Sequence, residues 1–317
     1  MCRMVDLRQA VLAKNDATAQ VLRTELTARG TTVVNLLSSP GSGKTALLER
    51  ELLLARERGV PVAALTADLA TENDALRLAR SGVPVKQVLT DGLCHLEAAM
   101  LGRHLDGWLP EDTRLLFVEN VGNLVCPAGY DLGESLRVVL ASVTEGEDKP
   151  LKYPTAFGLA QLVVVTKTDI ARAVEFDEAA FRANVEQVNP GVEVVLTSAR
   201  AGAGLGVLLD RALAAGAGTG THTPVMARQQ QAHEHGHGNE HGHGHEHGYV
   251  QGHAHEPGHD HDHEHDADLD HEHEHDHDAD LDHEHEHDHD ADHDHDHDHG
   301  HGHDHDHPHV HTVAQTR

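Results

Sequence analysis

The sequence predicts an α/β protein with a doubly wound, mostly parallel sheet, followed by a disordered C-terminal tail. Three observations favour this. Short apolar runs alternate with helical patterns between residues 31 and 216, which is typical of a sheet covered by helices on both faces. A glycine-rich stretch, Ser38–Thr45, joins the first run to the next helical pattern, as in a phosphate-binding loop. Beyond residue 232, histidines and acids replace the apolar residues that a core requires.

The body of the chain alternates between the two periodicities. Residues 5–29 have apolar side chains at helical spacing, with Gly30 as a stop signal. Strands are expected at Val33–Leu37, Val62–Thr66, Val85–Leu89, Leu115–Glu119, Leu162–Thr166 and Glu193–Thr197. Helices are expected near 45–58, 73–81, 94–106, 131–142, 177–188 and 204–215. Ligand groups should gather at the carboxyl ends of such strands.

Composition divides the chain into unlike parts. We expect an N-terminal helical segment at 1–30, a nucleotide-binding domain at 31–216, a linker at 217–232 and a tail at 233–317. The net charge is −4 before residue 233 and −25 after it, so the acidity belongs to the tail. The body has no basic patch for nucleic acid and no apolar run long enough to span a membrane. Without a secretory signal, and with three cysteines, the chain is expected to be cytoplasmic, its thiols free or metal-bound.

The glycine-rich stretch has the features of a phosphate site. Gly41 and Gly43 would let backbone N–H groups curl around phosphate oxygens. Lys44 would reach the β- and γ-phosphates, and Thr45 would place its hydroxyl on Mg²⁺. We therefore expect this loop to bind a nucleotide through Pro40, Gly41, Ser42, Gly43, Lys44, Thr45 and Ala46.

Two carboxylates follow or end predicted strands. Asp68 could hold Mg²⁺ directly or through water, or position an attacking water, although a turn or helix cap is the alternative. Glu119 ends an apolar strand and Gly122 follows it, as where phosphate-loop proteins place a metal carboxylate and a γ-phosphate-sensing turn. The expected catalytic groups are Lys44, Thr45, Asp68 and Glu119.

Two later stretches indicate guanine. Thr166-Lys-Thr-Asp169 looks like the guanine-specificity motif, in which Asp169 would accept from N1–H and the 2-amino group and Lys167 would cover the base. Thr166 replaces the usual Asn, which puts one loop-bracing hydrogen bond in doubt. Ser198 and Ala199 lie in a stretch similar to the last motif of GTPases, where a backbone N–H contacts guanine O6. Their order along the chain favours GTP over ATP.

Cys94-His95 and Cys126 form a candidate soft-metal set. Thiolate and imidazole suit Zn²⁺ or Ni²⁺, whereas the alternative is that the cysteines are small buried hydrophobes. We expect Cys94 and His95 at a helix start, and Cys126 lies seven residues after Glu119. Three ligands do not complete a tetrahedral site, so a second subunit could supply the rest.

The tail contains 31 histidines between residues 233 and 311, and a twelve-residue unit at 266–277 recurs at 278–289. Neutral imidazoles bind Ni²⁺, Zn²⁺ and Cu²⁺, so we expect a metal store that ligand type alone does not make specific for nickel. Its representative ligands are His233, His235, His237, His241, His243, His245, His271, His273, His275 and His277.

These residues together resemble the HypB family of nickel-incorporation GTPases. The resemblance covers roughly residues 15–210 and rests on the stretches Asn35–Thr45, Cys94–Ala98, Glu119–Asn123, Cys126–Ala128, Asp131–Glu134 and Gly146–Pro154. It implies a SIMIBI-type G domain that converts GTP and water to GDP and phosphate and forms a homodimer with GTP. It also implies nickel delivery to a [NiFe]-hydrogenase large-subunit precursor with a HypA-like nickel protein, and it places Mg²⁺ at Thr45, Asp68 and Glu119.

Two other interpretations remain open. The urease nickel GTPase is similar, but its metal motif is Cys-Pro-His, whereas Cys94-His95 and Cys126-Pro127 are separate here. A nickel or zinc storage protein whose GTPase is incidental would also explain the tail.

Overall fold

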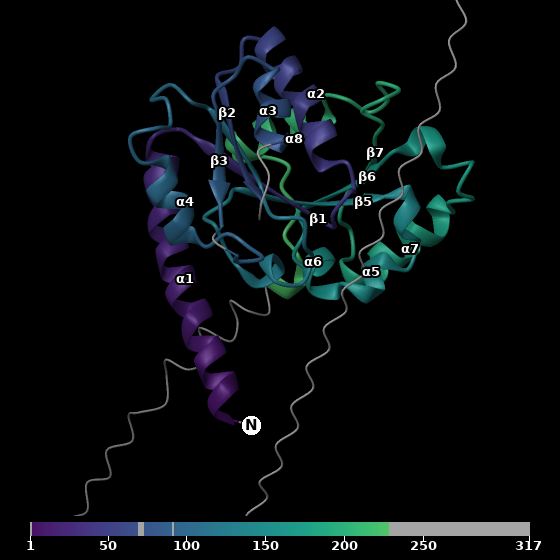
Figure 1. Ribbon diagram of the computed structural model, residues 1–317. Coiled ribbons are helices and arrows are strands. Elements are labelled where there is room, and N and C mark those ends of the chain that lie inside the picture. Colours follow the sequence, from purple (N-terminus) through teal and green to yellow (C-terminus); the bar gives the residue numbers. More distant parts are fainter. Residues whose placement is uncertain (1, 69–72, 91, 228–317) are drawn as a thin grey trace, which may run out of the picture. The chain divides into compact units, whose positions relative to one another are not determined.

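The structure is a computed structural model that describes residues 2–68, 73–90 and 92–227. Within these residues, seven strands form one sheet in the order β3-β2-β4-β1-β5-β6-β7, and every ladder between them is parallel. Helices cover both faces of the sheet (Figure 1). The predicted doubly wound α/β fold is therefore confirmed.

The elements alternate along the chain. The strands are β1 (Thr32–Ser38), β2 (Val62–Asp68), β3 (Val85–Leu89), β4 (Leu115–Glu119), β5 (Leu136–Ser142), β6 (Leu162–Thr166) and β7 (Val194–Leu196). The α-helices are α1 (Cys2–Ala28), α2 (Lys44–Glu57), α3 (Asn73–Ala79), α4 (Ala98–Leu105), α5 (Lys149–Lys152), α6 (Pro154–Gly158), α7 (Glu178–Val188) and α8 (Val207–Gly216). Short 3₁₀ turns are η1 (Pro127–Gly129), η2 (Val143–Glu145) and η3 (Thr168–Ile170).

Three apolar clusters hold the layers together. Leu48 of α2 and Leu208 of α8 pack on one face of the sheet. On the other face, Leu101 of α4 packs with residues of α1, β2 and β4, while Phe157 and Phe181 of α6 and α7 pack against β5 and β6. Since both faces are covered, the strands are continuous apolar runs rather than alternating ones.

The prediction of a helix at 131–142 is wrong, because Leu136–Ser142 forms strand β5 between β1 and β6. Arg137 interrupts the apolar run and makes it resemble a helix with a polar face. In the fold, however, the Arg137 guanidinium is buried and its Nε lies 2.7 Å from Glu134 Oε1. The β-branched pair Val138-Val139 suits a strand covered on both faces.

The helix expected near 94–106 begins later, so Cys94 and His95 lie in the preceding loop and not at a helix start. Glu97 is extended, with φ −110° and ψ 154°. The first helical N–H, that of Ala98, donates to Asn15 Oδ1 of α1 at 3.0 Å. This cap comes from a residue 83 positions away in sequence, so local periodicity did not reveal it.

The segment that follows α8 contacts the body before the tail. His222 Nε2 lies 2.8 Å from Asn189 Oδ1, and Met226 lies against Gly158, where a Cβ would collide with its sulfur. Residues 228–232 of the expected linker and the whole tail lie outside the described residues. Among the residues that the structure describes, no helix is long and apolar enough to cross a membrane.

Candidate functional site

The phosphate-binding loop leads from β1, the central strand, to α2. Its two glycines have positive φ, +71° at Gly41 and +92° at Gly43, a conformation that residues with a Cβ rarely adopt. At Gly43 a Cβ would also stand 3.7–4.0 Å from Lys167 and Thr166. The loop therefore has the open backbone and the helix N-terminus that bind phosphate.

Glu119 of β4 contacts the first two residues of α2. The Thr45 hydroxyl donates to Glu119 Oε1 at 2.6 Å, and Lys44 Nζ lies 3.5 Å from the same oxygen. Glu119 is 1% exposed, and its Oε2 has no hydrogen-bond partner in the described part of the chain. Burial raises the pKa of the Glu119 carboxyl, while Lys44 and Thr45 oppose that shift. A buried carboxylate oxygen without a partner beside a hydroxyl fits a Mg²⁺ site, because Mg²⁺ prefers oxygen ligands.

Asp68 ends β2, the strand beside β4, at the same edge of the sheet. In the ladder Thr66 is paired with Glu119, so Asp68 extends two residues beyond that pair. The structure thus places Asp68 on the carboxyl edge near Glu119, and α3 does not begin until Asn73.

The two stretches predicted to bind guanine meet at the carboxyl ends of β6 and β7. The Ser198 hydroxyl donates to Asp169 Oδ1 at 2.6 Å, which fixes the carboxylate that would read the base. Lys167, at φ 59°, donates from Nζ to the carbonyl of Gly41 at 2.6 Å. The base-side loops therefore contact the phosphate loop directly.

Thr166 braces the phosphate loop despite replacing the usual Asn. Its hydroxyl donates to the Ser42 carbonyl at 2.5 Å, with the Ala141 carbonyl 3.4 Å away. Thr166 is 3% exposed, so water does not compete freely for this bond. A threonine in place of the usual Asn therefore still makes a hydrogen bond that braces this loop.

The two cysteines of the candidate metal set lie together. A hydrogen bond between the two thiols is the main cause that raises the pKa of Cys94, with burial second. His95 Nδ1 is 3.7 Å from Cys94 Sγ, and its ring stacks on Tyr130 with centroids 4.0 Å apart. Burial lowers the pKa of His95, although Glu97 opposes this, so the neutral imidazole that binds metals is favoured.

One subunit does not complete this set. In residues 2–68, 73–90 and 92–227, no three His, Cys, Asp or Glu side chains form a group that could hold a metal. His95 Nε2 is buried without a hydrogen-bond partner among those residues, and Glu97 Oε1 lies 3.8 Å from it. The described residues therefore do not form a closed four-ligand structural site.

Lys149, for which no sequence pattern indicates a role, also contacts the phosphate loop. Its Nζ donates to Ser39 Oγ at 2.5 Å and to Glu145 Oε1 at 2.8 Å, and the residue is 7% exposed. Lys149 lies in the Gly146–Pro154 stretch, whose unusual composition could have drawn attention to it. The spacing of residues in that stretch does not reveal that Lys149 contacts the phosphate loop. Asn120 and Tyr130 were likewise missed.

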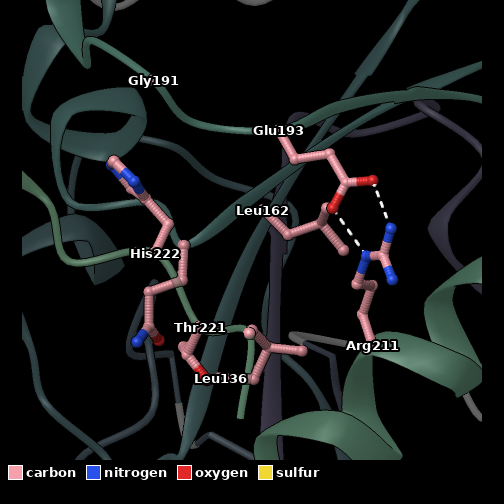
Figure 2. Close-up of a pocket in the computed structure, with 9 residues that line it drawn as sticks. Leu136, Leu162, Gly191, Glu193, Arg211, Thr221 and His222 are labelled. Atoms are coloured by element: carbon pink, nitrogen blue, oxygen red, sulfur yellow. Dashed lines mark hydrogen bonds and ion pairs between the residues drawn. The ribbon is translucent and has the colours of Figure 1, made fainter.

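A separate cavity of about 270 Å³ lies at the opposite, amino edge of the sheet (Figure 2). Leu136 and Leu162, the first residues of β5 and β6, line it together with His222 and the ion pair of Glu193 with Arg211. None of the residues predicted to bind nucleotide or metal lines this cavity, so it is not part of the candidate site. The tail histidines proposed as ligands lie outside the described residues.

Comparison with known proteins connects these features. The family profile "CobW/HypB/UreG, nucleotide-binding domain" matches residues 32–196. Hydrogenase maturation factor HypB of Azotobacter chroococcum mcd 1 is 49% identical over 205 residues, covering 64% of this chain and 67% of that protein. HypB of Escherichia coli K12 is 45% identical over 203 residues, with coverage of 64% and 70%. The hydrogenase/urease maturation factor HypB of Helicobacter hepaticus is 40% identical over 212 residues, with coverage of 66% and 86%.

Two solved structures share the fold. HypB from Helicobacter pylori in complex with nickel has a TM-score of 0.61 at 36% identity and covers 66% of this chain and 99% of that one. HypB from Archaeoglobus fulgidus has a TM-score of 0.58 at 35% identity, with coverage of 63% and 97%. The matched range of the family profile ends at residue 196, before the histidine-rich tail.

Proposed function

Since this chain belongs to the HypB family of hydrogenase maturation factors, we propose that it is a GTP-hydrolysing metallochaperone that stores and delivers nickel to [NiFe]-hydrogenase. The observation that carries the proposal is the position of Glu119. Its carboxylate contacts Lys44 and Thr45 of the phosphate loop, and the chain that follows it leads in seven residues to Cys126. Nucleotide chemistry and a metal ligand thus share one short segment.

The nucleotide would be GTP, hydrolysed to GDP and phosphate. Asp169, held by Ser198, would accept from the guanine edge, and Lys44 would neutralise charge on the β- and γ-phosphates. Thr45 and Glu119 would hold Mg²⁺, with Asp68 bound directly or through water. When bound, Mg²⁺ supplies charge neutralisation on the phosphate oxygens.

Nickel, or zinc in the same place, would be the cargo at Cys94, His95 and Cys126. A relative was crystallised in complex with nickel, which supports this metal. Beside the two cysteines, Leu93 and Val125 are exposed apolar side chains. A GTP-dependent homodimer that covers them would bring a second half-site against the first, which agrees with the incomplete set in one subunit.

Partners and location extend the proposal. We expect a HypA-like nickel protein and a [NiFe]-hydrogenase large-subunit precursor as partners, in the cytoplasm. The relatives' descriptions as hydrogenase maturation factors support that pathway. The urease alternative gains support from the Helicobacter hepaticus relative, whose description names both enzymes.

The proposal is tested with the full chain and two variants. Lys44→Ala should abolish GTP hydrolysis while thiolate-bound nickel persists, and Cys126→Ser should lose thiolate-bound nickel while GTP still binds. Hydrogenase maturation in cells should fail with either. Normal maturation with Lys44→Ala would refute the GTPase role.

A storage protein is the second candidate, favoured by the 31 histidines of the tail. Deleting residues 228–317 distinguishes the two. Maturation that persists at ordinary nickel supply identifies the tail as a store and the GTPase domain as the insertion machine. Maturation that fails even with excess nickel shows that transfer from the tail is obligatory.

A further inference from the structure

A line of buried amide and carboxylate groups runs beneath the two loops that carry the candidate metal ligands. It begins at Asn120, which directly follows Glu119 and is 1% exposed. Its Oδ1 accepts from the backbone N–H of Val121 at 2.9 Å and from that of Leu96 at 3.3 Å. Leu96 is the neighbour of His95, so one side chain joins the Cys94-His95 loop to the residue beside Glu119.

The line continues across the sheet to the second loop. Asn120 Nδ2 donates to Asn35 Oδ1, and Asn35 Nδ2 donates to Glu134 Oε1, both at 3.4 Å. Asn35 is fully buried in β1, three residues before that strand ends. The same strand continues into the phosphate loop.

Glu134 passes the connection to the chain after Cys126. Its Oε1 accepts from Arg137 Nε at 2.7 Å, and the two Nη groups of Arg137 donate to the carbonyls of Ala128 and Tyr130 at 3.0 Å each. Tyr130 in turn stacks on the His95 ring. The hydrogen bonds therefore link both metal-bearing loops to one another.

Energetics make this network a unit. Breaking the line would cost the Leu96 N–H and the amides of Asn35 and Asn120 a hydrogen bond in the interior, and a buried polar group that is left unpaired costs about 1–3 kcal/mol. Asn120 also has its backbone N–H on the Leu36 carbonyl at 3.1 Å. If a change at the phosphate loop shifts Glu119, Asn120 therefore moves with it and keeps its hydrogen bonds, because breaking them costs more than moving their partners.

From this geometry we infer that Asn120 is the positioning residue that couples the nucleotide state to the Cys94-His95 loop, with Asn35, Glu134 and Arg137 carrying the same displacement to the loop of Cys126. The inference rests on the proposed function and specifies its regulation. Glu119 is then connected to Cys126 through the backbone as well as through hydrogen bonds, and to His95 through the hydrogen bonds of Asn120.

The experiment compares nickel affinity in two nucleotide states. Ni²⁺ is titrated into the full chain, in a Cys2→Ser background, with Mg²⁺ and either GDP or a non-hydrolysable GTP analogue. Thiolate-to-nickel charge-transfer absorption follows the cysteine site, since tail histidines do not produce it. Without a further substitution, the nickel affinities in the two nucleotide states should differ by at least about fivefold, as in typical coupled sites. In Asn120→Ala they should differ by less than about twofold.

Asn189→Ala is the matched control. Asn189 is likewise a buried asparagine whose side chain bonds to the backbone, donating to the carbonyls of Phe157 and Ala160, but it lies on the amino side of the sheet. It should lose a similar amount of stability and keep the full ratio. A full ratio in folded Asn120→Ala, or an equal loss of the ratio in Asn189→Ala, would overturn the inference.

If Asn120→Ala does not fold, the inference can still be tested on the Cys2→Ser chain without that substitution. Hydrogen exchange of the Leu96 amide should change between GDP and the analogue, and an identical rate in both states overturns the inference. Failure of the proposed function is distinguishable: a chain that binds no GTP or no thiolate-bound nickel refutes the function itself. A chain that binds both ligands with a ratio of one refutes only the coupling.

Discussion

Glu119 is a carboxylate whose burial the fold accommodates at a cost in stability. One oxygen contacts Thr45 and Lys44, and the other is buried without a hydrogen-bond partner among the described residues. Functional groups are commonly held in environments that do not favour stability. The orphaned oxygen is therefore better explained by a bound cation than by packing.

Replacing Glu119 with Gln should reduce Mg²⁺-dependent GTP hydrolysis by about 10²-fold, the usual range for removing one preorganised electrostatic group. GDP binding without Mg²⁺ should change little. Steady-state phosphate release checks the first effect and nucleotide fluorescence the second. An unchanged hydrolysis rate would exclude Glu119 from the metal site.

The same residue predicts a pH dependence of stability without Mg²⁺. Because the folded pKa of Glu119 is raised, its contribution is present below the unfolded pKa and is lost as the pH rises through the folded value. Denaturant unfolding should therefore show Glu119→Gln gaining stability relative to the wild type as the pH rises from 4.5, the unfolded value, towards neutrality. A constant difference across that range would contradict the raised pKa.

Thr166 allows a cleaner test of loop bracing. Thr166→Val removes the hydroxyl that donates to Ser42 and keeps the shape, so GTP affinity should weaken about fivefold, equivalent to roughly 1 kcal/mol. Thr66→Val is the control, because Thr66 Oγ1 is buried without a hydrogen-bond partner in the described part of the chain. Equal effects of the two substitutions on GTP affinity would count against bracing.

The sequence predicted where strands end more readily than it predicted contacts between distant residues. Strand ends at Glu119 and Thr166 were located correctly because apolar runs stop there. Lys149 was not assigned, since its contact with Ser39 spans 110 positions. Such contacts depend on how strands are ordered in space, which local patterns do not encode.

At the scale of elements, β5 shows how a buried ion pair can lead a sequence pattern to predict a helix where the chain forms a strand. Burial alone would raise the pKa of Glu134, but Arg137 and backbone N–H groups lower it to about 2. A charged pair held this way behaves as part of the core. Periodicity assigns charged residues to solvent, which is why the pattern at 131–142 predicts a helix rather than a buried strand.

Glu134→Gln should destabilise the fold by about 3 kcal/mol, because it leaves the buried Arg137 unneutralised. The lowered pKa adds a pH signature: the contribution of Glu134 is present above its unfolded value of 4.5 and is lost as the pH falls towards about 2. Guanidinium unfolding at pH 7 and pH 3 should show a smaller difference between wild type and variant at pH 3. Equal differences would show that the pair is not ionised.

The α4 boundary also depends on tertiary structure. Asn15 accepts from the Ala98 N–H and donates to the Asp131 carbonyl, so α1 fixes both where α4 begins and where the chain before β5 lies. The sequence located α1 as a helix but not this bridge. Cys94 and His95 are therefore in a loop because a distant helix caps the one after them.

At the scale of the molecule, the fold class followed from the alternation of apolar runs with helical patterns, and the sheet confirms it. Strand order did not follow, because parallel connections allow several arrangements. The order matters for function: β1 lies between β4 and β5, which places the phosphate loop between the Glu119 segment and the β5 ladder.

Metal uptake by the tail should depend on pH. Nickel stoichiometry of the full chain minus that of a chain ending at residue 227 should fall steeply between about pH 7 and pH 5, since imidazoles with pKa ~6.5 protonate there. Equilibrium dialysis measures it. Equal differences at both pH values would show that carboxylates rather than imidazoles hold the metal.

The contact of His222 with Asn189 also determines how far the tail must reach to bring nickel to the cysteines. Asn189 uses its amide N–H groups on two carbonyls, so its oxygen accepts and His222 donates from Nε2. This attachment is at the amino edge of the sheet beside β6 and β7, whereas the cysteine loops follow the carboxyl ends of β3 and β4, which lie roughly 20 Å away along a strand and at least three strands away across the sheet, each strand spacing adding about 4.8 Å. From His222 to His233 the chain spans at most about 36–40 Å when extended. If the tail delivers nickel as proposed, the length of the chain between His222 and the first tail histidines limits which of them can come near the cysteines.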